Sequence, residues 1–273
     1  MAQDTGKFRK NTKDQYYTKR VVVDRCVAAL MSRVAEPSTY QWIEPSAGAG
    51  VFLKALPSGC ESVGMDLEPK GPGILEGDFL AWTPISPKKR IVFGNPPFGR
   101  QGCLAKAFIK HAATMADVIA FILPRSFVKP SMSRAFPLAF HCDWSEEIEK
   151  DAFEVNGSSY NVPCVFQIWT KRTTNRVVEE AVDPVGFIYV KSDQPYDIAF
   201  KRVGGSAGKC CLKGTGTYNP QYHYYLKLDS TEHQDAIVEA INQHVFPSNT
   251  VGPRSLSKSE VNEVVNVIIA EAR

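Results

Sequence analysis

The chain has 273 residues, of which 44% are hydrophobic and 22% are charged. These proportions are those of an ordinary globular protein and exclude a disordered or fibrous chain, while the length allows one large domain or a domain with a smaller appendage. The formal net charge of +3 is too small to indicate a class of partner by itself.

Residues 1–10 are polar and basic without an apolar core, so they do not resemble a secretory signal. No stretch approaches the roughly 18 apolar residues that a membrane span needs. The seven cysteines are scattered and none form a Cys-x-x-Cys pair, which favours free thiols in a reducing compartment over a zinc site. We therefore expect an intracellular protein, cytoplasmic or nuclear, without a membrane or metal partner.

Hydrophobic periodicity in the first two-thirds of the chain alternates between the spacings of helices and strands. It predicts helices at about 19–35, 51–56 and 104–115, and strands at about 40–44, 62–66, 90–94 and 118–123. Segments 148–155 and 162–169 are predicted to pair antiparallel at a sheet edge. This alternation predicts an α/β fold with a mostly parallel sheet covered by helices on both faces.

The pattern changes near residue 184. Residues 185–228 are rich in aromatic residues, glycines and β-branched residues, which predicts several irregular strands, and two helices follow them. The apolar stripe of the last helix, from Val261 to Ile269, is typical of core packing. We therefore predict one domain over residues 1–184 and a smaller α+β region, accessory or substrate-recognising, over residues 185–273.

Three short motifs come before the predicted strand at 90–94. The first is the run Glu44-Pro45-Ser46-Ala47-Gly48-Ala49-Gly50, whose small residues let backbone N–H groups approach a ligand closely. Asp66 ends the next strand, where an acid can accept hydrogen bonds from ribose hydroxyls. In Gly77-Asp78-Phe79 the carboxylate can accept a hydrogen bond from an adenine amino group, and the aromatic ring can pack against the adenine. Each motif alone is compatible with a turn or a strand-end cap, but their order along the chain favours a cofactor site.

The strongest signal is Asn95-Pro96-Pro97-Phe98, which directly follows the predicted strand at 90–94. It is therefore predicted at a carboxyl end of the sheet, where open α/β folds bind ligands. Because the prolines fix the backbone, the Asn95 side-chain oxygen and the Pro96 carbonyl can both face one NH₂ group, and Phe98 can stack on a planar base. A plain proline turn is the alternative, which the preceding motifs disfavour.

The order of these motifs resembles that of the class I S-adenosylmethionine-dependent amino-methyltransferases. It looks most like the DNA adenine methyltransferases whose cofactor motifs precede a catalytic Asn-Pro-Pro-aromatic motif. The resemblance covers about residues 14–171. The matching elements are Asp14-Gln15-Tyr16-Tyr17-Thr18, with Lys19 where the family has proline, then Glu44–Gly50, Gly64–Pro69, Gly77–Leu80, Asn95–Phe98 and Phe121–Ser126.

The resemblance implies a Rossmann-like class I methyltransferase fold, with residues 1–184 as the catalytic domain and S-adenosylmethionine as cofactor. It implies methyl transfer to the exocyclic N6 amine of an adenine in nucleic acid, DNA favoured over RNA, with the base turned out of its strand. The implied catalytic group is Asn95, Pro96, Pro97 and Phe98. The implied cofactor site is Tyr17, Thr18, Glu44, Pro45, Ser46, Ala47, Gly48, Gly50, Asp66, Leu67, Asp78, Phe79 and Asn95.

Basic residues are concentrated after the Asn-Pro-Pro-Phe motif. Between residues 98 and 134, six lysines and arginines stand against Asp117 alone. Such segregation fits a polyanionic partner, although a set of solvated faces gives the same pattern. We predict that phosphate groups of the nucleic acid are contacted by Arg100, Lys106, Arg125, Lys129 and Arg134.

Three other functions share parts of this pattern. Methylation of adenine in RNA uses the same tetrapeptide. Methylation of a protein glutamine can use the same grip on an amide NH₂, but that related family usually carries tyrosine at the position of Phe98. A non-catalytic nucleic-acid-binding subunit would keep the fold, but the intact Asp66, Asp78 and Asn95 argue against it.

Overall fold

The chain forms two compact units that divide at about residue 178. None of the helices described is long and apolar enough to cross a membrane. The computed structural model describes residues 16–155, 157–178, 181–216, 218–248, 250 and 253–272.

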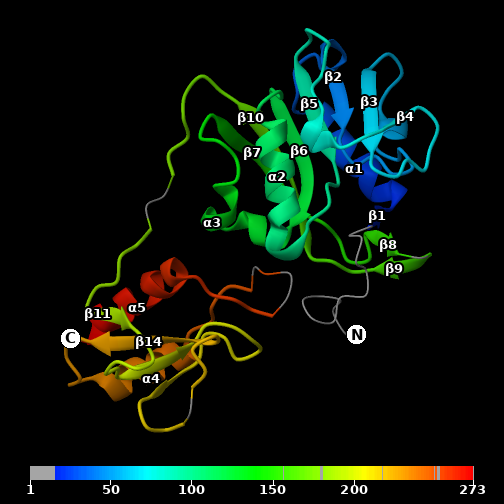
Figure 1. The fold of residues 1–273 in the computed structure, drawn as a ribbon. Coiled ribbons are helices and arrows are strands. Elements are labelled where there is room, and N and C mark those ends of the chain that lie inside the picture. Colours follow the sequence, from blue (N-terminus) through cyan, green and yellow to red (C-terminus); the bar gives the residue numbers. More distant parts are fainter. Residues whose placement is uncertain are drawn as a thin grey trace. The chain divides into compact units, whose positions relative to one another are not determined.

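The first unit is built on a seven-stranded sheet with the order β4-β3-β2-β5-β6-β10-β7 (Figure 1). All neighbouring pairs from β4 to β6 are parallel, whereas β10 runs antiparallel to β6 and β7. This is the Rossmann-like class I methyltransferase fold, so the predicted fold class is confirmed. The strands are β2 (Gln41–Glu44), β3 (Glu61–Asp66), β4 (Ile74–Glu76), β5 (Arg90–Gly94), β6 (Val118–Pro124), β7 (Phe140–Glu147) and β10 (Cys164–Lys171).

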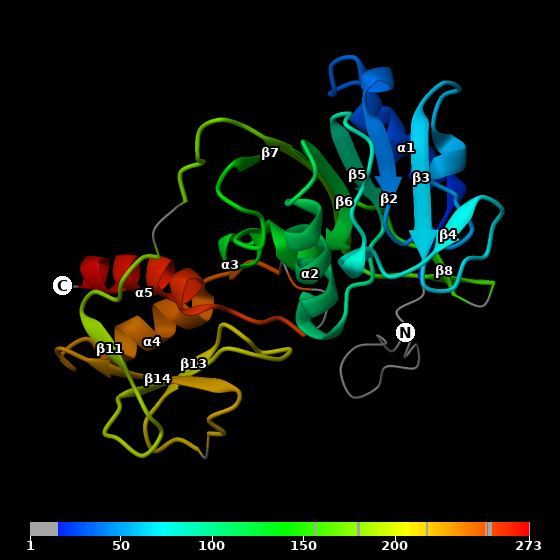
Figure 2. The same ribbon diagram turned by 45° about the horizontal axis from the view of Figure 1, so that its top comes forward.

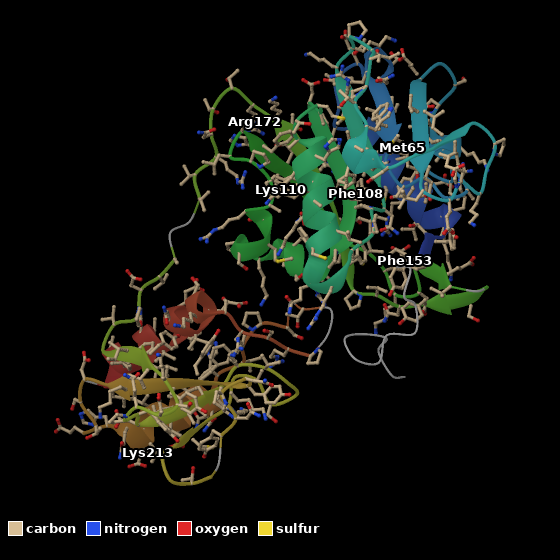
Figure 3. All side chains as sticks on the ribbon, in the orientation of Figure 1. Met65, Phe108, Lys110, Phe153, Arg172 and Lys213 are labelled. Atoms are coloured by element: carbon tan, nitrogen blue, oxygen red, sulfur yellow. The ribbon has the colours of Figure 1, made fainter. Side chains whose placement is uncertain are left out.

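Helices α1 (Arg20–Met31) and α2 (Cys103–Ala112) cover opposite faces of this sheet (Figures 1 and 2). Strand β6 is buried along its whole length, so both of its faces are apolar. Met65 of β3 and Phe108 of α2 (both labelled in Figure 3) share a core cluster with Phe121 of β6. The pleat turns alternate residues to the other face, where Trp42 meets Phe93 edge to face at 5.2 Å.

The predicted helix at 51–56 is wrong, because only a single 3₁₀ turn, η3 (Leu53–Ala55), forms there. Leu56 precedes Pro57 and has the extended backbone that a following proline imposes, so the turn cannot lengthen into an α-helix. Other short elements also lie outside the predicted set. They are η2 (Pro37–Thr39), η4 (Phe79–Ala81), η5 (Arg100–Gly102), η6 (Arg125–Val128) and α3 (Pro130–Ser133).

An antiparallel edge pair exists, but its members differ from the predicted ones. The edge partner of β10 is β7, not segment 148–155. Strand β7 lies at the sheet edge, so it is half exposed and rich in acids. Because of this polarity, its sequence did not indicate a strand. Instead, β8 (Phe153–Val155) forms a separate small sheet with β9 (Ser158–Tyr160) and with β1 (Tyr17–Thr18).

The second unit is a four-stranded antiparallel sheet packed against two helices, α4 (Gln234–Gln243) and α5 (Lys258–Ala272) (Figure 2). Residues of the sheet such as Phe200 and Leu226 share one apolar core with Ile241 and Val265 of the helices. The unit is therefore α+β, with one face of the sheet covered by helices. Its strands, in the order β11-β14-β12-β13, are β11 (Phe187–Val190), β14 (His223–Leu228), β12 (Ile198–Lys201) and β13 (Cys210–Leu212).

Candidate active site

A pocket of about 500 Å³ opens at the carboxyl ends of β2, β3 and β5 in the first unit. The strand order reverses between β2 and β5, and such a switch point is where open α/β sheets bind ligands. Asn95 and Pro97 of the predicted catalytic group line the pocket, whereas Pro96 and Phe98 do not. Gly50 of the predicted cofactor site is also absent from the lining. The predicted cofactor residues that line it are Tyr17, Thr18, Glu44, Pro45, Ser46, Ala47, Gly48, Asp66, Leu67, Asp78, Phe79 and Asn95.

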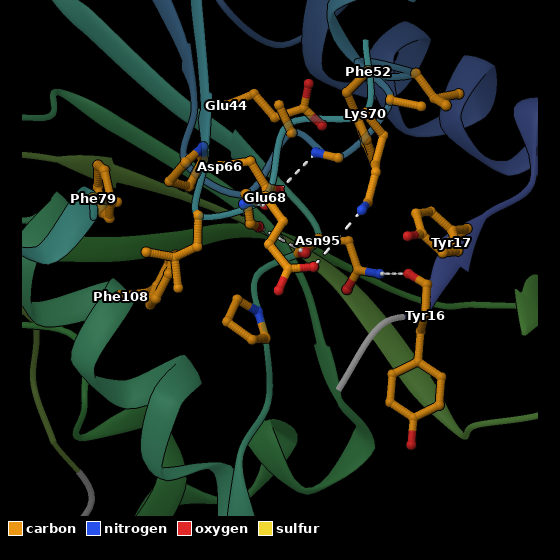
Figure 4. A pocket seen from close by; sticks show the side chains of 18 of the residues that line it. Tyr16, Tyr17, Glu44, Phe52, Asp66, Glu68, Lys70, Phe79, Asn95 and Phe108 are labelled. Atoms are coloured by element: carbon orange, nitrogen blue, oxygen red, sulfur yellow. Dashed lines mark hydrogen bonds and ion pairs between the residues drawn. The ribbon is translucent and has the colours of Figure 1, made fainter. Parts of the chain in front are cut away.

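Asp66 braces the small-residue loop across the pocket floor (Figure 4). Its Oδ2 accepts a hydrogen bond from the Gly48 N–H at 2.7 Å, and its Oδ1 accepts one from the Glu68 N–H at 2.9 Å. Gly48 has a φ of +51°, which other residues rarely adopt. The loop therefore follows a path that needs glycine and is fixed by a carboxylate on the neighbouring strand.

Glu44 ends β2 and is only 2% exposed. Its Oε2 accepts a hydrogen bond from the Leu53 N–H at 3.2 Å, which ties the strand end to turn η3. Burial raises the pKa of the Glu44 carboxyl well above 4.5, the Leu53 N–H lowers it in part, and the Asp66 charge raises it further. This acid is therefore held in its neutral form well above the usual pH range of a glutamate.

Asn95 is held through its side-chain NH₂ group and its backbone oxygen. Its Nδ2 donates to the backbone oxygen of Tyr16 at 3.1 Å and to Oγ1 of Thr18 at 3.2 Å (Figure 4). Its backbone oxygen accepts a hydrogen bond from Oγ of Ser46 at 3.1 Å. Because the Tyr16 carbonyl can only accept, it fixes which end of the amide is the NH₂ group. Among the described residues, the buried Asn95 Oδ1 has no hydrogen-bond partner.

Phe98 is buried against aromatic residues beside the pocket and is only 7% exposed. Its ring stacks on that of Tyr16, with 6.1 Å between centroids and 24° between planes. Tyr16 also contacts the rings of Tyr160 and Phe153, at 5.5 Å and 6.4 Å. Tyr16 just before β1, Phe153 of β8 and Tyr160 of β9 thus form an aromatic wall next to Asn95. Sequence reasoning had predicted Phe98 alone for this role.

At the far end of the pocket, Asp78 begins turn η4 and its Oδ1 accepts a hydrogen bond from the Leu80 N–H at 2.9 Å. The Phe79 ring is 1% exposed and meets His111 edge to face at 4.8 Å, so most of it belongs to the core. The half-exposed Leu80 and Leu104 add apolar surface to the lining.

Several lining residues were missed by sequence reasoning. Leu104 and Phe108 come from α2, and their helical spacing indicates only that this face is buried. Glu68 and Lys70 follow β3 and form an ion pair of 3.7 Å at the pocket. Glu68 lies two residues after Asp66, and this closeness to a strand end is the sequence feature that could have identified it as a lining residue.

The predicted phosphate-binding residues occupy different environments. Arg100 and Arg134 are exposed and Lys106 is half-buried, whereas the Arg125 side chain pairs with Glu147 of β7. Lys129 is only 8% exposed and already has a partner within the protein, so it offers little surface to a phosphate. Lys129 joins η6 to α3, and this turn carries it into the interior.

The fold is Rossmann-like, and its pocket lies at the switch point of the sheet. No family model and no curated protein matches the chain. Among solved structures, a proposed RNA methyltransferase from Pyrococcus horikoshii is 19% identical with a TM-score of 0.46, covering 60% of this chain and 91% of its own. A proposed class I S-adenosylmethionine-dependent methyltransferase from Listeria monocytogenes is 13% identical with a TM-score of 0.46, covering 63% and 66%. Likenesses of this size leave the reaction to be argued from the geometry of the pocket.

Proposed function

We propose that the protein transfers a methyl group from S-adenosylmethionine to the exocyclic N6 amine of an adenine in nucleic acid, with DNA favoured over RNA. The observation that carries this proposal is the buried, unpartnered Oδ1 of Asn95 in the wall of the pocket. A buried acceptor without a donor costs about 1–3 kcal/mol, so its retention is explained when a ligand supplies the donor. An N–H of the adenine amine is such a donor.

The residues of the opposite wall fit S-adenosylmethionine. The loop around Gly48 exposes backbone for close approach, and each oxygen of Asp66 keeps a lone pair for a ribose hydroxyl. Asp78 uses Oδ1 for its own turn, and its other oxygen can accept from the cofactor's adenine amine. When bound, S-adenosylmethionine supplies an electrophilic methyl group on a sulfonium sulfur.

Asn95 orients the substrate amine rather than exchanging protons with it. By accepting one N–H, its Oδ1 turns the amine so that the nitrogen lone pair faces the pocket interior. Tyr16, Thr18 and Ser46 hold the Asn95 dipole in place before substrate arrives, so little reorganisation is needed during the reaction. The chain therefore contributes positioning and fixed electrostatics.

Tyr16, which lines the pocket and stacks on the buried Phe98, is the proposed wall for the target base, which must leave its strand to reach the pocket. Arg100, Lys106 and Arg134 remain proposed phosphate contacts, since none of them is buried. The preference for DNA rests on the resemblance of the Asp14–Thr18 segment to the DNA enzymes, of which the structure describes residues 16–18.

The experiment is mass spectrometry of nucleosides after incubation of DNA and RNA with the protein and isotope-labelled S-adenosylmethionine. We expect N6-methyldeoxyadenosine. N6-methyladenosine alone would move the activity to RNA, and no methylated nucleoside from either polymer would refute the proposal.

Asn95→Ala should abolish transfer while leaving the Kd for S-adenosylmethionine within a few-fold of wild type. Asn175→Ala, which changes an exposed asparagine of the same unit, is the matched control. Full activity of the Asn95 variant would remove Asn95 from the reaction.

A further inference from the structure

Charge is segregated within the second unit. Residues 187–228, which contain the four strands, carry six lysines and arginines against two aspartates. Residues 229–272, which contain both helices, carry seven acids against Arg254 and Lys258. The helices lie on one face of the sheet. The opposite face therefore belongs to the basic half of the unit.

Strand register defines that opposite face, here called the open face. Residues that point away from the helices alternate with the core residues along each strand. Pairing aligns Val190, Tyr225, Ala199 and Cys211 across the four strands, and Lys201 lies opposite His223 in the next row. The open face is therefore a continuous surface with lysine, histidine and tyrosine side chains on it.

Tyrosines gather on the open face. Six of the ten tyrosines of the chain lie between residues 189 and 225. Tyr189 and Tyr224 pack with the helix-covered core, whereas Tyr196, Tyr218 and Tyr225 belong to the open face. Tyr225 is 5% exposed and is covered by Tyr196, whose ring centroid is 4.8 Å away. The Tyr225 hydroxyl donates to the backbone oxygen of Tyr218 at 2.8 Å, and the Tyr218 ring contacts His223 at 5.2 Å. Tyr196 and Tyr218 are therefore the outer, half-buried rings of a fixed cluster.

Lysines border this cluster. The Lys213 ammonium lies 5.6 Å from the centroid of the Tyr196 ring, and Lys201 is on the neighbouring strand. Lys227 is paired with Asp197 at 2.9 Å, so its charge is already matched. Lys201 and Lys213 are thus the cations that the open face offers beside its aromatic rings.

We propose that the open face of the second unit binds single-stranded DNA. Bases stack on the rings of Tyr196 and Tyr218, and phosphates contact Lys201 and Lys213. Aromatic rings beside basic side chains suit an unpaired strand, because a duplex keeps its base faces covered. The choice of DNA rests on the proposed function. As a second site on one chain, this face would raise the local concentration of substrate strand at the first unit.

The test is binding of a labelled oligothymidylate to the full chain, followed by fluorescence anisotropy at several salt concentrations. This strand has no adenine, so its binding does not depend on the methyltransferase pocket. Tyr196→Leu with Tyr218→Leu keeps Tyr225 covered and should weaken binding about tenfold or more, from two lost base stacks. Lys201→Ala with Lys213→Ala should flatten the slope of log K against log salt by about 1.4, which is about 0.7 per phosphate contact.

Lys258→Ala is the matched control, because Lys258 lies over Tyr189 on the helix-covered face, and it should change neither quantity. Far-ultraviolet circular dichroism and melting temperature confirm that each variant is folded. Unchanged affinity and slope in the folded open-face variants would overturn the proposal. So would equal or tighter binding of duplex DNA or of oligouridylate.

Failure here is distinguishable from failure of the proposed function. Asn95→Ala should bind oligothymidylate as wild type does, even when it transfers no methyl group. Conversely, the protein could methylate adenine while its affinity for oligothymidylate is unchanged in every open-face variant. That outcome would support the proposed reaction and refute the second site.

Discussion

Replacing Thr18 by valine should lower the rate of methyl transfer without releasing the cofactor. Thr18 is 9% exposed, and its Oγ1 accepts one of the two hydrogen bonds that orient the Asn95 amide. Valine keeps the shape and suits strand β1, but it leaves an Asn95 N–H without its acceptor. Such a loss costs about 1–3 kcal/mol. If the orientation of Asn95 limits the reaction, this corresponds to a fall in kcat of about 5- to 150-fold.

The assay is steady-state methylation of an adenine-containing oligonucleotide, with the Kd for S-adenosylmethionine measured by calorimetry. Thr18→Ser keeps the hydroxyl and should recover most of kcat, which a purely structural role would not require. The Kd of the valine variant should stay within a few-fold of wild type. An unchanged kcat, or a loss that serine does not restore, would refute the positioning role of Thr18.

Three further changes test the site and its support. Asp66→Ala should weaken S-adenosylmethionine binding by about 1.5–3 kcal/mol, because it removes charged acceptors and leaves the Gly48 N–H without its partner. An unchanged Kd in calorimetry would exclude Asp66 from the site. Because burial raises the pKa of Glu44, the folded chain keeps a proton that the unfolded chain loses just above pH 4.5, and stability falls as pH rises through that window. In Glu44→Gln this dependence is absent, so urea unfolding should favour the variant progressively as the pH rises above 4.5. Parallel curves for the two proteins would contradict the buried neutral acid. Phe136 is 1% exposed, and its ring stacks on that of Trp169 with 4.0 Å between centroids. Phe136→Ala should lower the free energy of unfolding by about 3–5 kcal/mol. A loss well below about 1 kcal/mol would show that this stack does not support the core.

Most of the pocket was predictable from the sequence, because its residues occur in short motifs directly after strands. Parallel strands bring their carboxyl ends to one edge, so Glu44, Asp66 and Asn95 meet as soon as β2, β3 and β5 pair. The same logic gave the α/β fold, since alternating apolar periods constrain which elements can share a sheet.

Polar edge elements were harder to predict. Strand β7 exposes Asp143 and Glu147 to solvent, and without an apolar run its sequence resembles a loop. The turn at Lys129 carries a lysine inward, which no charge pattern indicates, because charge in sequence says nothing about which way a side chain points.

The sequence alone determined that Asn95 follows a strand and faces a ligand-binding edge. Only the tertiary structure decided how Asn95 is held. Tyr16 and Thr18 lie 79 and 77 residues earlier in the chain, and they reach the Asn95 amide because β1 pairs with β8 in a small separate sheet. A strand of two residues such as β1 has almost no hydrophobic periodicity, so its sequence does not indicate its partner strand. Packing of Tyr16 against Phe153 and Tyr160 determines that pairing instead.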